Sequence, residues 1–455
     1  MSPTVPPVSS PADRPLLFGV ASAALQVEGA VDVDGRGRSI WEDFQARPGA
    51  IANGDVLDDA VLHHANMAGD VALIAALGVD AYRFSVSWPR VVPDGTGRVN
   101  AAGLGFYDRL VDELLAAGIA PVATLYHWDL PAAMQTRGGW TNRATALAFA
   151  DYAATVASRL GDRVSHWVTV NEPRVAGLIG HAQGRHAPGT SDLASGVAAS
   201  HHLLVAHGLA TQAVRAELGG GARIGISIDL VPQRPADPDD ERHVRAAHLQ
   251  DLQTNAFFLD AVTGHGYPDD LVEAYGAAMP SIRTGDMALI AEPTDFLGIN
   301  HYRSETVAPL DDSHPQAHWA FAWPQPVTGP STAMGWNIDP PSLREVIDRA
   351  VVAGVDDVVI TESGMATEES LDDPALVDDQ ARIDWLDAHL QVVHDARADG
   401  VPVSGYFVWT LMDNFEWGEG YRPRFGLIAT DPGTDLRLPK ASARWYRDHI
   451  RDHHA

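Results

Sequence analysis

The sequence predicts an α/β protein built as a single (β/α)8 TIM barrel, in which long loops after the strands form the active-site pocket. Two features lead to this fold class. Short runs rich in apolar and β-branched residues alternate eight times with longer stretches, several of them helical in pattern. Most of the short runs are apolar throughout, as expected for parallel strands buried on both faces of a sheet.

Each short apolar run is a candidate strand of the barrel. The eight predicted strands are Leu16–Ser22, Ala81–Ser85, Ile119–Leu125, Val164–Asn171, Arg223–Leu230, Phe296–Asn300, Asp357–Glu362 and Val403–Trp409. After residue 15, no stretch rich in proline, glycine and serine is long enough to be an interdomain linker. We therefore expect residues 16–455 to form one catalytic domain.

Helical patterns lie between the predicted strands. Apolar residues recur at helical spacing over Asp59–Leu77, and an Ala-rich helix is expected over Thr141–Leu160. Ser342-Leu-Arg-Glu345 has the form of a capping box, so we expect a helix to begin there and to stop at Gly354, directly before the seventh strand.

Three long loops are expected, at Val31–Val56, Pro232–Glu241 and Arg303–Pro341. The last of them contains Trp319, Trp323 and Trp336. Aromatic residues in a polar loop can form a small core of their own. Because this loop follows a strand end, where barrel sites form, they can equally form the wall of a ligand site. The sequence leaves these two alternatives open.

Composition excludes several classes of partner. The formal net charge is −28, whereas binding to nucleic acid or to an anionic membrane needs a surface of Lys and Arg. No stretch of about 18 apolar residues is present, so no membrane span is expected. Without cysteine there is no disulfide, thiolate metal site or cysteine nucleophile.

The first 15 residues contain five prolines and lack the basic and apolar segments of a signal peptide. We expect residues 1–15 to be a disordered leader. Together with the absence of cysteine, this composition predicts a cytoplasmic protein. The oligomeric state stays open, although closed homo-oligomers are common among such chains.

The carboxyl ends of the predicted strands carry chemically versatile side chains, and barrel enzymes place their catalytic groups there. Two are glutamates, Glu172 after the fourth strand and Glu362 on the seventh. The others are Gln26, Arg83, His127, Trp128, Asn171, Asn300, Tyr302, Trp409, Glu416 and Trp417. Two carboxyl groups surrounded by amides and indoles point to cleavage of a glycosidic bond, because that reaction uses paired carboxyl groups.

Nine motifs stand in order between Phe18 and Tyr446. They are FGVASAALQVEG, RFSVSWPRVVPDG, LYHWDLP, WVTVNEP, FLGINHY, MGWNIDP, ITESG, GYFVWTLMDNFEWGEGYRPRFGL and PKASARWY. In this order and spacing they resemble the motifs of family 1 glycoside hydrolases, the family of β-glucosidases and their relatives. Each motif alone is only moderately specific, but the set covers nearly the whole chain.

The resemblance implies a role for each matching residue. Glu362 corresponds to the nucleophile and Glu172 to the acid/base. Arg83 and Tyr302 flank Glu362, and Asn171 holds the sugar's 2-hydroxyl group. The other substrate-binding residues are Gln26, His127, Trp128, Asn300, Trp409, Glu416 and Trp417, with Phe425 in the pocket wall and Trp336 on the leaving-group side.

The family's chemistry implies a retaining, two-step mechanism without metal or cofactor. Retention predicts carboxyl groups about 5–5.5 Å apart. A negative charge on Glu362 is expected to raise the pKa of Glu172, giving a bell-shaped pH profile. Hydrolysis and transglycosylation share the same glycosyl intermediate, so the sequence does not separate them.

The expected substrate is a small β-glycoside or a short β-linked oligosaccharide. The phosphorylated-sugar branch of the family has Ser and Lys near the position of Glu416, and a carboxylate there accepts hydrogen bonds from neutral hydroxyls and repels phosphate. We therefore expect unphosphorylated β-D-glucosides, with β-galactosides and β-fucosides as secondary substrates. The sequence departs from the family at Ser363, usually Asn, and at His301, usually Tyr.

Two rival functions are less favoured. A non-catalytic sugar-binding homologue would have lost a catalytic carboxylate, and both are present. A metal hydrolase on the same fold would use the chain's histidines, and the candidates are His63, His64, His127, His201 and His202. Adjacent histidines on a helix point apart, so the paired ones are poor ligands for a single ion.

Overall fold

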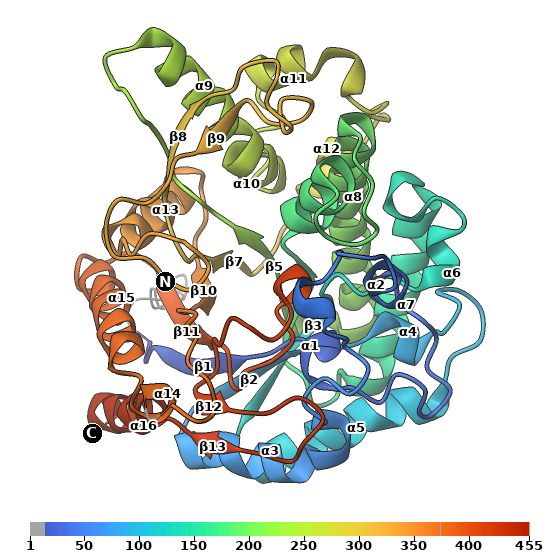
Figure 1. Cartoon of the computed structure of the whole chain (residues 1–455). Helices are drawn as coiled ribbons and strands as arrows, with labels where there is room; N and C mark the ends of the chain where they lie inside the picture. Colours follow the sequence, from blue (N-terminus) through green and yellow to red (C-terminus); the bar gives the residue numbers. More distant parts are fainter. Residues whose placement is uncertain (1–13, 374, 455) are drawn as a thin grey trace, which may run out of the picture.

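The centre of the protein is a closed barrel of eight parallel strands surrounded by helices (Figure 1). The structure is a computed structural model that describes residues 14–373 and 375–454. The barrel strands are β1 (Leu17–Ala21), β2 (Ala81–Ser85), β3 (Ala120–Tyr126), β4 (His166–Asn171), β5 (Arg223–Asp229), β7 (Phe296–Asn300), β10 (Val358–Ser363) and β11 (Val403–Trp409). All eight predicted strands are present, which confirms the predicted fold class. The predicted leader lies outside the described residues except for Arg14 and Pro15.

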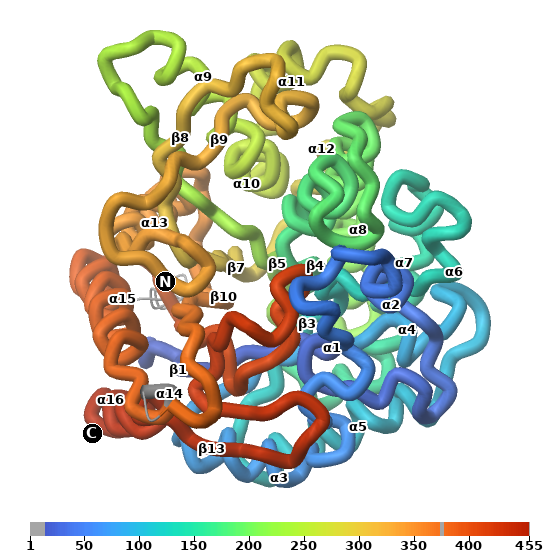
Figure 2. The backbone as a smooth tube through the Cα atoms, viewed as in Figure 1, coloured from blue at the N-terminus to red at the C-terminus, as the bar shows by residue number. Residues whose placement is uncertain are grey.

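Pairing between the first and last strands closes the barrel. Ala21 of β1 lies opposite Trp409 of β11 on one side and opposite Arg83 of β2 on the other. In Figure 1 the blue β1 therefore lies beside the orange-red β11, although almost the whole sequence separates them, and Figure 2 traces the same backbone as a tube. This closure brings the carboxyl ends of all eight strands to one face of the barrel.

Helices cover the outside of the barrel and connect its strands. The longer helices are α3 (His63–Leu77), α5 (Ala101–Ala116), α7 (Ala144–Leu160), α8 (Leu193–Leu218), α9 (Glu241–Asp251), α13 (Pro341–Val352), α15 (Gln380–Ala398) and α16 (Ala441–His454). The shorter ones are α1 (Ala24–Val27), α2 (Ile40–Gln45), α4 (Trp88–Val91), α6 (Ala132–Gln135), α10 (Phe257–Val262), α11 (Asp269–Tyr275), α12 (Asp286–Ile290) and α14 (Ala375–Asp378).

Two predicted helices begin later than expected. The helix expected from Asp59 begins at His63, because Leu62 has a left-handed backbone with φ of 59° and a right-handed helix cannot pass through it. The helix expected from Thr141 begins at Ala144, whose N–H donates to the Asn142 side chain. That side chain turns the chain before the helix begins.

The predicted capping box at Ser342 does not form. Helix α13 begins at Pro341, so Ser342 lies inside the first turn and its hydroxyl donates to the Asp339 carbonyl. Glu345 pairs with Arg234 instead of reaching back to the backbone. Proline at the first helical position needs no N–H partner, and the helix starts two residues earlier than a cap at Ser342 would place it.

The expected long loops contain regular structure that the sequence did not reveal. The region Val31–Val56 includes α2, and Arg303–Pro341 includes β8 (Glu305–Pro309) and β9 (Ala322–Pro324). These two strands join β6 (Gln233–Pro235) in a small sheet, visible beside α9 in Figure 1. Its buried face packs Val307 and Ala322 on Ala246 and Ala247 of α9. A second small sheet pairs β12 (Ile428–Ala429) with β13 (Leu438–Pro439).

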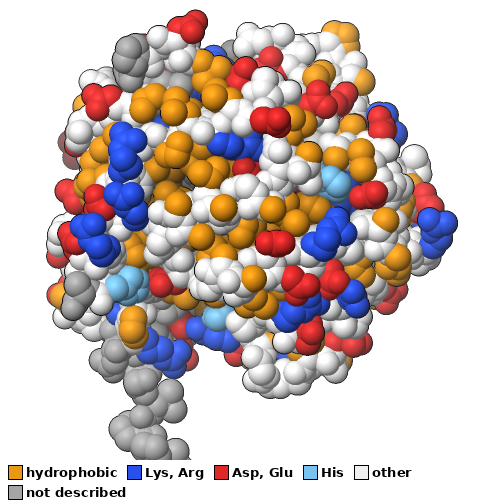
Figure 3. Space-filling view, turned by 90° about the horizontal axis from the view of Figure 1, so that it is seen from below, with side chains coloured by type: hydrophobic (Ala, Val, Ile, Leu, Met, Phe, Trp, Pro, Cys, Tyr) orange, Lys and Arg blue, Asp and Glu red, His pale blue; other side chains and the backbone are white. Residues whose placement is uncertain are grey.

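The surface mixes charges of both signs. Figure 3 shows acidic and basic side chains interspersed over one face, with hydrophobic side chains between them. Within residues 14–373 and 375–454, none of the helices combines the length and apolar character that crossing a bilayer requires.

Candidate active site

Four neighbouring strands end in polar side chains at one edge of a cavity. Asn171 ends β4, Asp229 ends β5, Asn300 ends β7, and Glu362 lies one residue before the end of β10. In the strand register Asn300 lies opposite both Asp229 and Glu362. A cavity of about 350 Å³ opens beyond these strand ends.

Most of the residues predicted from the sequence line this cavity. They are His127, Trp128, Glu172, Asn300, Tyr302, Trp336, Glu362, Trp409, Glu416, Trp417 and Phe425. The other three, Gln26, Arg83 and Asn171, are buried directly behind the lining residues and contact them.

Glu362 is held by two donors. Arg83 Nη1 donates to Glu362 Oε1 at 2.6 Å, and the Tyr302 hydroxyl donates to Oε2 at 2.7 Å. The ion pair is almost fully buried, with 1% and 3% of the two side chains exposed. Both contacts favour the ionised carboxylate and fix its orientation.

Glu172 is held differently, by a neutral amide. Asn300 Nδ2 donates to Glu172 Oε1 at 2.6 Å, and the Glu172 backbone has a left-handed φ of 48°. Trp128 and Trp417 also have positive φ and also line the cavity. Such backbone strain in non-glycine residues often accompanies functional sites, where surrounding contacts hold it in place.

The two glutamates differ in proton affinity. Burial raises the pKa of Glu172 well above its usual value, and the charges of Asp229 and then Glu362 raise it further. Burial also raises the pKa of Glu362, but Arg83 and Tyr302 oppose that rise. Glu172 is therefore the group that holds a proton. The direction expected from the sequence is found, but Glu362 is only the third cause, after burial and Asp229.

Asn171 lies in a network that joins both glutamates. Its Oδ1 accepts from Arg83 Nη2 at 2.6 Å and from Asn300 Nδ2 at 3.0 Å. Its Nδ2 lies 3.2 Å from His127 Nε2. Since the side chain is fully buried and tied to three neighbours, its position is rigidly determined.

Aromatic rings form one wall of the cavity. The His127 ring is nearly parallel to those of Trp409 and Trp417, with centroids 5.6 Å and 5.9 Å away. Burial, together with the Arg83 charge, lowers the pKa of His127 well below its usual value, so the ring is neutral. On another side, the Phe425 ring lies 6.0 Å from that of Tyr302.

Gln26 and Glu416 form a polar end of the cavity. Gln26 Nε2 donates to the Phe415 carbonyl at 2.8 Å and lies 3.5 Å from Glu416 Oε2. Gln26 Oε1 is buried and accepts no hydrogen bond from the described residues. Burial and the charge of Glu362 raise the pKa of Glu416 to about 8. Burial thus favours the protonated form of a group that we expected, from the sequence, to be a carboxylate.

The tryptophans of the Arg303–Pro341 region combine both predicted alternatives. Trp319 is 6% exposed and packs edge-on against Trp323, as in a small core. Trp319, Trp323 and Trp336 nevertheless all line the cavity. The departures from the family pattern lie behind it: the Ser363 hydroxyl donates to the His301 carbonyl, and His301 bonds Ser342.

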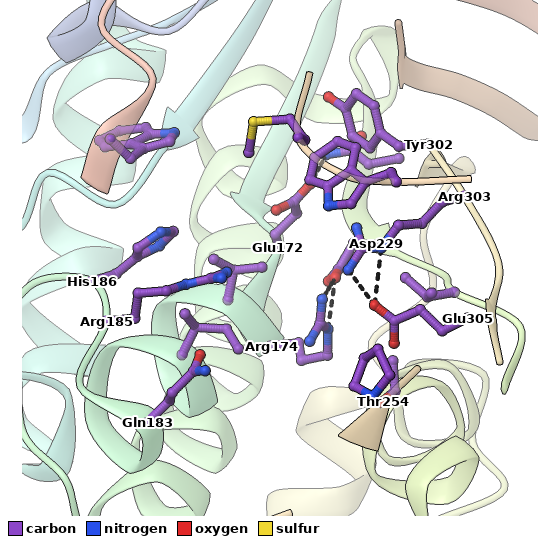
Figure 4. A pocket seen from close by; sticks show the side chains of 18 of the residues that line it. Glu172, Arg174, Gln183, Arg185, His186, Asp229, Thr254, Tyr302, Arg303 and Glu305 are labelled. Carbon is purple, nitrogen blue, oxygen red and sulfur yellow. Dashed lines mark hydrogen bonds and ion pairs between the residues drawn. The ribbon is translucent and has the colours of Figure 1, made fainter. Parts of the chain in front are cut away.

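Sequence reasoning missed a group of charged lining residues (Figure 4). They are Arg174, Arg185, Asp229, Arg303 and Glu305. Asp229 carried a usable signal, because it closes an apolar strand just as Glu362 does. Arg174 and Arg185 carried no such signal in the sequence. They flank a π-helical segment, Val175–Gln183, that follows Glu172, and neither residue ends a strand.

Among the described residues, the histidines considered as metal ligands do not form a cluster that could hold an ion. His63 bonds Asp70, His201 bonds Tyr267 and Asp286, and His202 bonds the Trp140 carbonyl. Among these candidates, only His127 lines the cavity. The histidine pairs therefore have structural partners and do not converge on one ion.

Comparison with known proteins identifies the family. Residues 10–455 match the model of glycosyl hydrolase family 1. The chain is 41% identical over 437 residues to β-glucosidase A of Thermotoga maritima, covering 96% of this chain and 97% of the relative. It is 43% identical over 459 residues to a bifunctional β-D-glucosidase/β-D-fucosidase of Bifidobacterium breve, covering 96% and 98%.

Solved structures agree with the sequence relatives. A family 1 β-glucosidase from Thermotoga maritima superposes with a TM-score of 0.91 at 40% identity, covering 97% of this chain and 98% of the other. A psychrophilic β-glucosidase from Micrococcus antarcticus gives 0.91 at 41% identity, covering 98% and 100%. One Thermotoga maritima structure is a complex with glucoimidazole. The chain therefore belongs to glycosyl hydrolase family 1 and is a glycoside hydrolase.

Proposed function

We propose that this enzyme is a retaining β-glucosidase that removes terminal non-reducing β-D-glucosyl residues from small β-glucosides and short β-linked oligosaccharides. The observation that carries the proposal is the unequal environment of the two cavity glutamates. Glu362 is paired with a buried arginine, whereas Glu172 has a strongly raised pKa. One carboxylate and one carboxylic acid are what glycosidic bond cleavage by double displacement requires.

In the first step, a Glu362 carboxylate oxygen attacks the anomeric carbon as the bond to the leaving oxygen breaks. Glu172 donates its proton to that oxygen, so the leaving group departs as a neutral alcohol. The product is a covalent glycosyl ester of Glu362. Arg83 and Tyr302 aim the attacking carboxylate, because each bonds one of its two oxygens.

In the second step, water attacks the anomeric carbon and the ester bond to Glu362 breaks. Esterification has removed the Glu362 charge, one of the charges that raises the pKa of Glu172. Glu172 can then remain ionised and accept a proton from the attacking water. Two inversions at the same carbon retain the configuration, and the chemistry needs no metal or cofactor.

The polar end of the cavity suits a neutral sugar. Gln26 has a free buried acceptor, and Glu416 has a carboxyl group that can accept or donate, according to pH. Indole faces of Trp409 and Trp417 offer apolar cover for the C–H face of a pyranose. These features support unphosphorylated β-D-glucosides as substrates. The relative described as a β-D-glucosidase/β-D-fucosidase supports β-fucosides as secondary substrates, and we also propose β-galactosides.

The direct test is hydrolysis of p-nitrophenyl β-D-glucoside, with the α-anomer and the 6-phospho-β-glucoside as comparison substrates. We expect turnover of the plain β-glucoside alone, unaffected by EDTA, with β-glucose as the first product in NMR spectra. Glu362→Ala should abolish turnover. First release of α-glucose, activity confined to the phosphorylated sugar, or full activity in Glu362→Ala would refute the proposal.

A further inference from the structure

The cavity also has a charged part near Glu172. Figure 4 shows Arg174 and Asp229 in the middle of this part, Arg303 and Glu305 on one side, and Arg185 on the other. All five residues line the cavity. Since Glu172 is the proposed proton donor to the leaving oxygen, groups around it in this part are placed to contact the leaving group.

Most of these charges neutralise one another in pairs. Arg174 Nε donates to Asp229 Oδ2 at 2.6 Å. Arg303 Nε donates to Glu305 Oε1 at 2.9 Å, and the Arg303 guanidinium also lies over the Trp336 ring, 4.5 Å from its centroid. These contacts pair two cations with two carboxylates, although Asp229 Oδ1 is buried and accepts no hydrogen bond from the described residues. A ligand gains little by competing with them.

Arg185 is left over from this pairing. Within the part of the chain that the structure describes, its guanidinium makes no hydrogen bond or ion pair. The charge of Glu419, an acidic lining residue, acts on Arg185, but Glu419 already accepts a hydrogen bond from Arg422 at 3.0 Å. The Arg303 and Arg174 charges add to the positive potential around Arg185, and burial with the Arg303 charge lowers its pKa. A guanidinium nevertheless stays protonated.

The backbone directs Arg185 toward the cavity. The π-helical turn Val175–Gln183 begins three residues after Glu172 and ends at Gly184, whose φ of 77° reverses the chain. Figure 4 shows the Arg185 side chain running from that turn toward the middle of the site. Arg185 keeps access to solvent, although it lines the cavity and the surrounding protein removes part of the hydration of its guanidinium. The Arg185 guanidinium, with its five N–H groups, therefore faces the part of the cavity that a leaving group would occupy.

We propose that Arg185 is a specificity-determining residue that binds an anionic leaving group, so that β-glucosides with a carboxylate on the aglycone are preferred substrates. A carboxylate matches the planar fork of a guanidinium and can form two parallel hydrogen bonds with it. The protein as a whole has a net charge of −28, so an unpaired cation in the substrate cavity runs against its overall charge. This inference rests on the proposed β-glucosidase function.

The test uses two matched pairs of substrates, the 3- and 4-carboxyphenyl β-D-glucosides and their methyl esters. We compare kcat/KM for each acid with that for its ester, in the wild type and in Arg185→Gln. Dividing the acid-to-ester ratio of the wild type by that of Arg185→Gln cancels the intrinsic reactivity of each leaving group. For at least one isomer, we expect the acid-to-ester ratio to fall about fivefold in Arg185→Gln, the size typical of an ion pair that retains solvent contact.

Two further variants separate charge from structure. Arg185→Lys keeps the positive charge and should retain part of the preference. Arg109→Gln makes the same change on the exposed surface of α5 and should leave the ratio unchanged. Added salt should lower the wild-type ratio but not that of Arg185→Gln.

The outcomes distinguish the two proposals. If the wild type hydrolyses the esters and p-nitrophenyl β-D-glucoside, but neither acid-to-ester ratio changes in Arg185→Gln, the anionic subsite is refuted and the β-glucosidase function stands. If the wild type hydrolyses none of these β-glucosides, the proposed function itself fails.

Discussion

The carboxylate of Asp229 raises the pKa of Glu172 more than the carboxylate of Glu362 does. Asp229 closes β5, lies opposite Asn300 in the strand register, and is bonded by Arg174. The proton affinity of Glu172 is therefore set mainly by burial and by the charges of Asp229 and Glu362. Because the Asp229 charge does not change when Glu362 is esterified, it sustains part of the raised pKa throughout the cycle.

We predict that Asp229→Asn shifts the alkaline limb of the kcat/KM profile to lower pH. That limb reports the loss of the Glu172 proton in the free enzyme, and removing a nearby negative charge lowers the pKa of Glu172. The substitution also frees Arg174 from its ion pair with Asp229, and the Arg174 charge lowers the pKa of Glu172 as well. The measurement is a pH profile with p-nitrophenyl β-D-glucoside. Asp239→Asn, on an exposed loop, is the control, and an unmoved limb in Asp229→Asn contradicts the role of Asp229.

Tyr302→Phe should move the acidic limb of the kcat/KM profile. The hydroxyl donates to Glu362 Oε2 at 2.7 Å and lowers the pKa of Glu362, so its loss raises that pKa and moves the acidic limb to higher pH. We also expect kcat/KM to fall about 10- to 100-fold, since a hydrogen bond to a charged group is removed. Tyr446→Phe, which removes a buried hydroxyl that donates to the Gly19 carbonyl, should change neither quantity. An acidic limb that stays in place would show that Tyr302 does not tune Glu362.

Glu416→Gln tests whether sugar binding depends on the ionisation of Glu416. The pKa of this group is raised to about 8, and an ionised carboxylate accepts stronger hydrogen bonds from hydroxyls than a neutral acid does. The inhibition constant of glucose should therefore fall as pH rises through about 8 in the wild type. In Glu416→Gln this decrease should be absent, because the amide does not titrate. The same pH dependence in both proteins would assign it to another group.

Gly208→Ala should destabilise the packing of α8 on α12. A Cβ atom at this position would lie 1.8 Å from the Leu289 carbonyl oxygen, so the two helices must move apart. We expect the free energy of unfolding to fall by about 1–3 kcal/mol, measured by denaturant titration. Gly105→Ala on α5 is the matched control. A Cβ atom at this position would contact only the Arg109 side chain, at 3.8 Å. Alanine is also more favourable than glycine inside a helix, by up to about 1 kcal/mol. Equal effects of both substitutions would argue against the close contact.

The eight strands could be predicted because each is a short run of mostly apolar residues that needs no knowledge of its neighbours. Glu172 and Glu362 followed from the same rule, since a carboxyl group at the end of a buried strand is costly without a purpose. Asp229 obeys that rule at the end of β5 and could have been found. Its influence on Glu172 could not, because it depends on the burial of both carboxyl groups and on the distance between them at the ends of the adjacent strands β4 and β5.

Local sequence thus determined the alternation of strands and helices, the absence of thiol chemistry and the family motifs, because these depend on residues close together in the chain. Only the tertiary structure decided that β6, β8 and β9 form a sheet, because strand pairing depends on distant segments. It also decided which charges near Glu172 are paired, and that Arg185 has no ion-pair partner among residues 14–373 and 375–454. Ion pairs and pKa values depend on distance and burial, and both are set when the barrel closes.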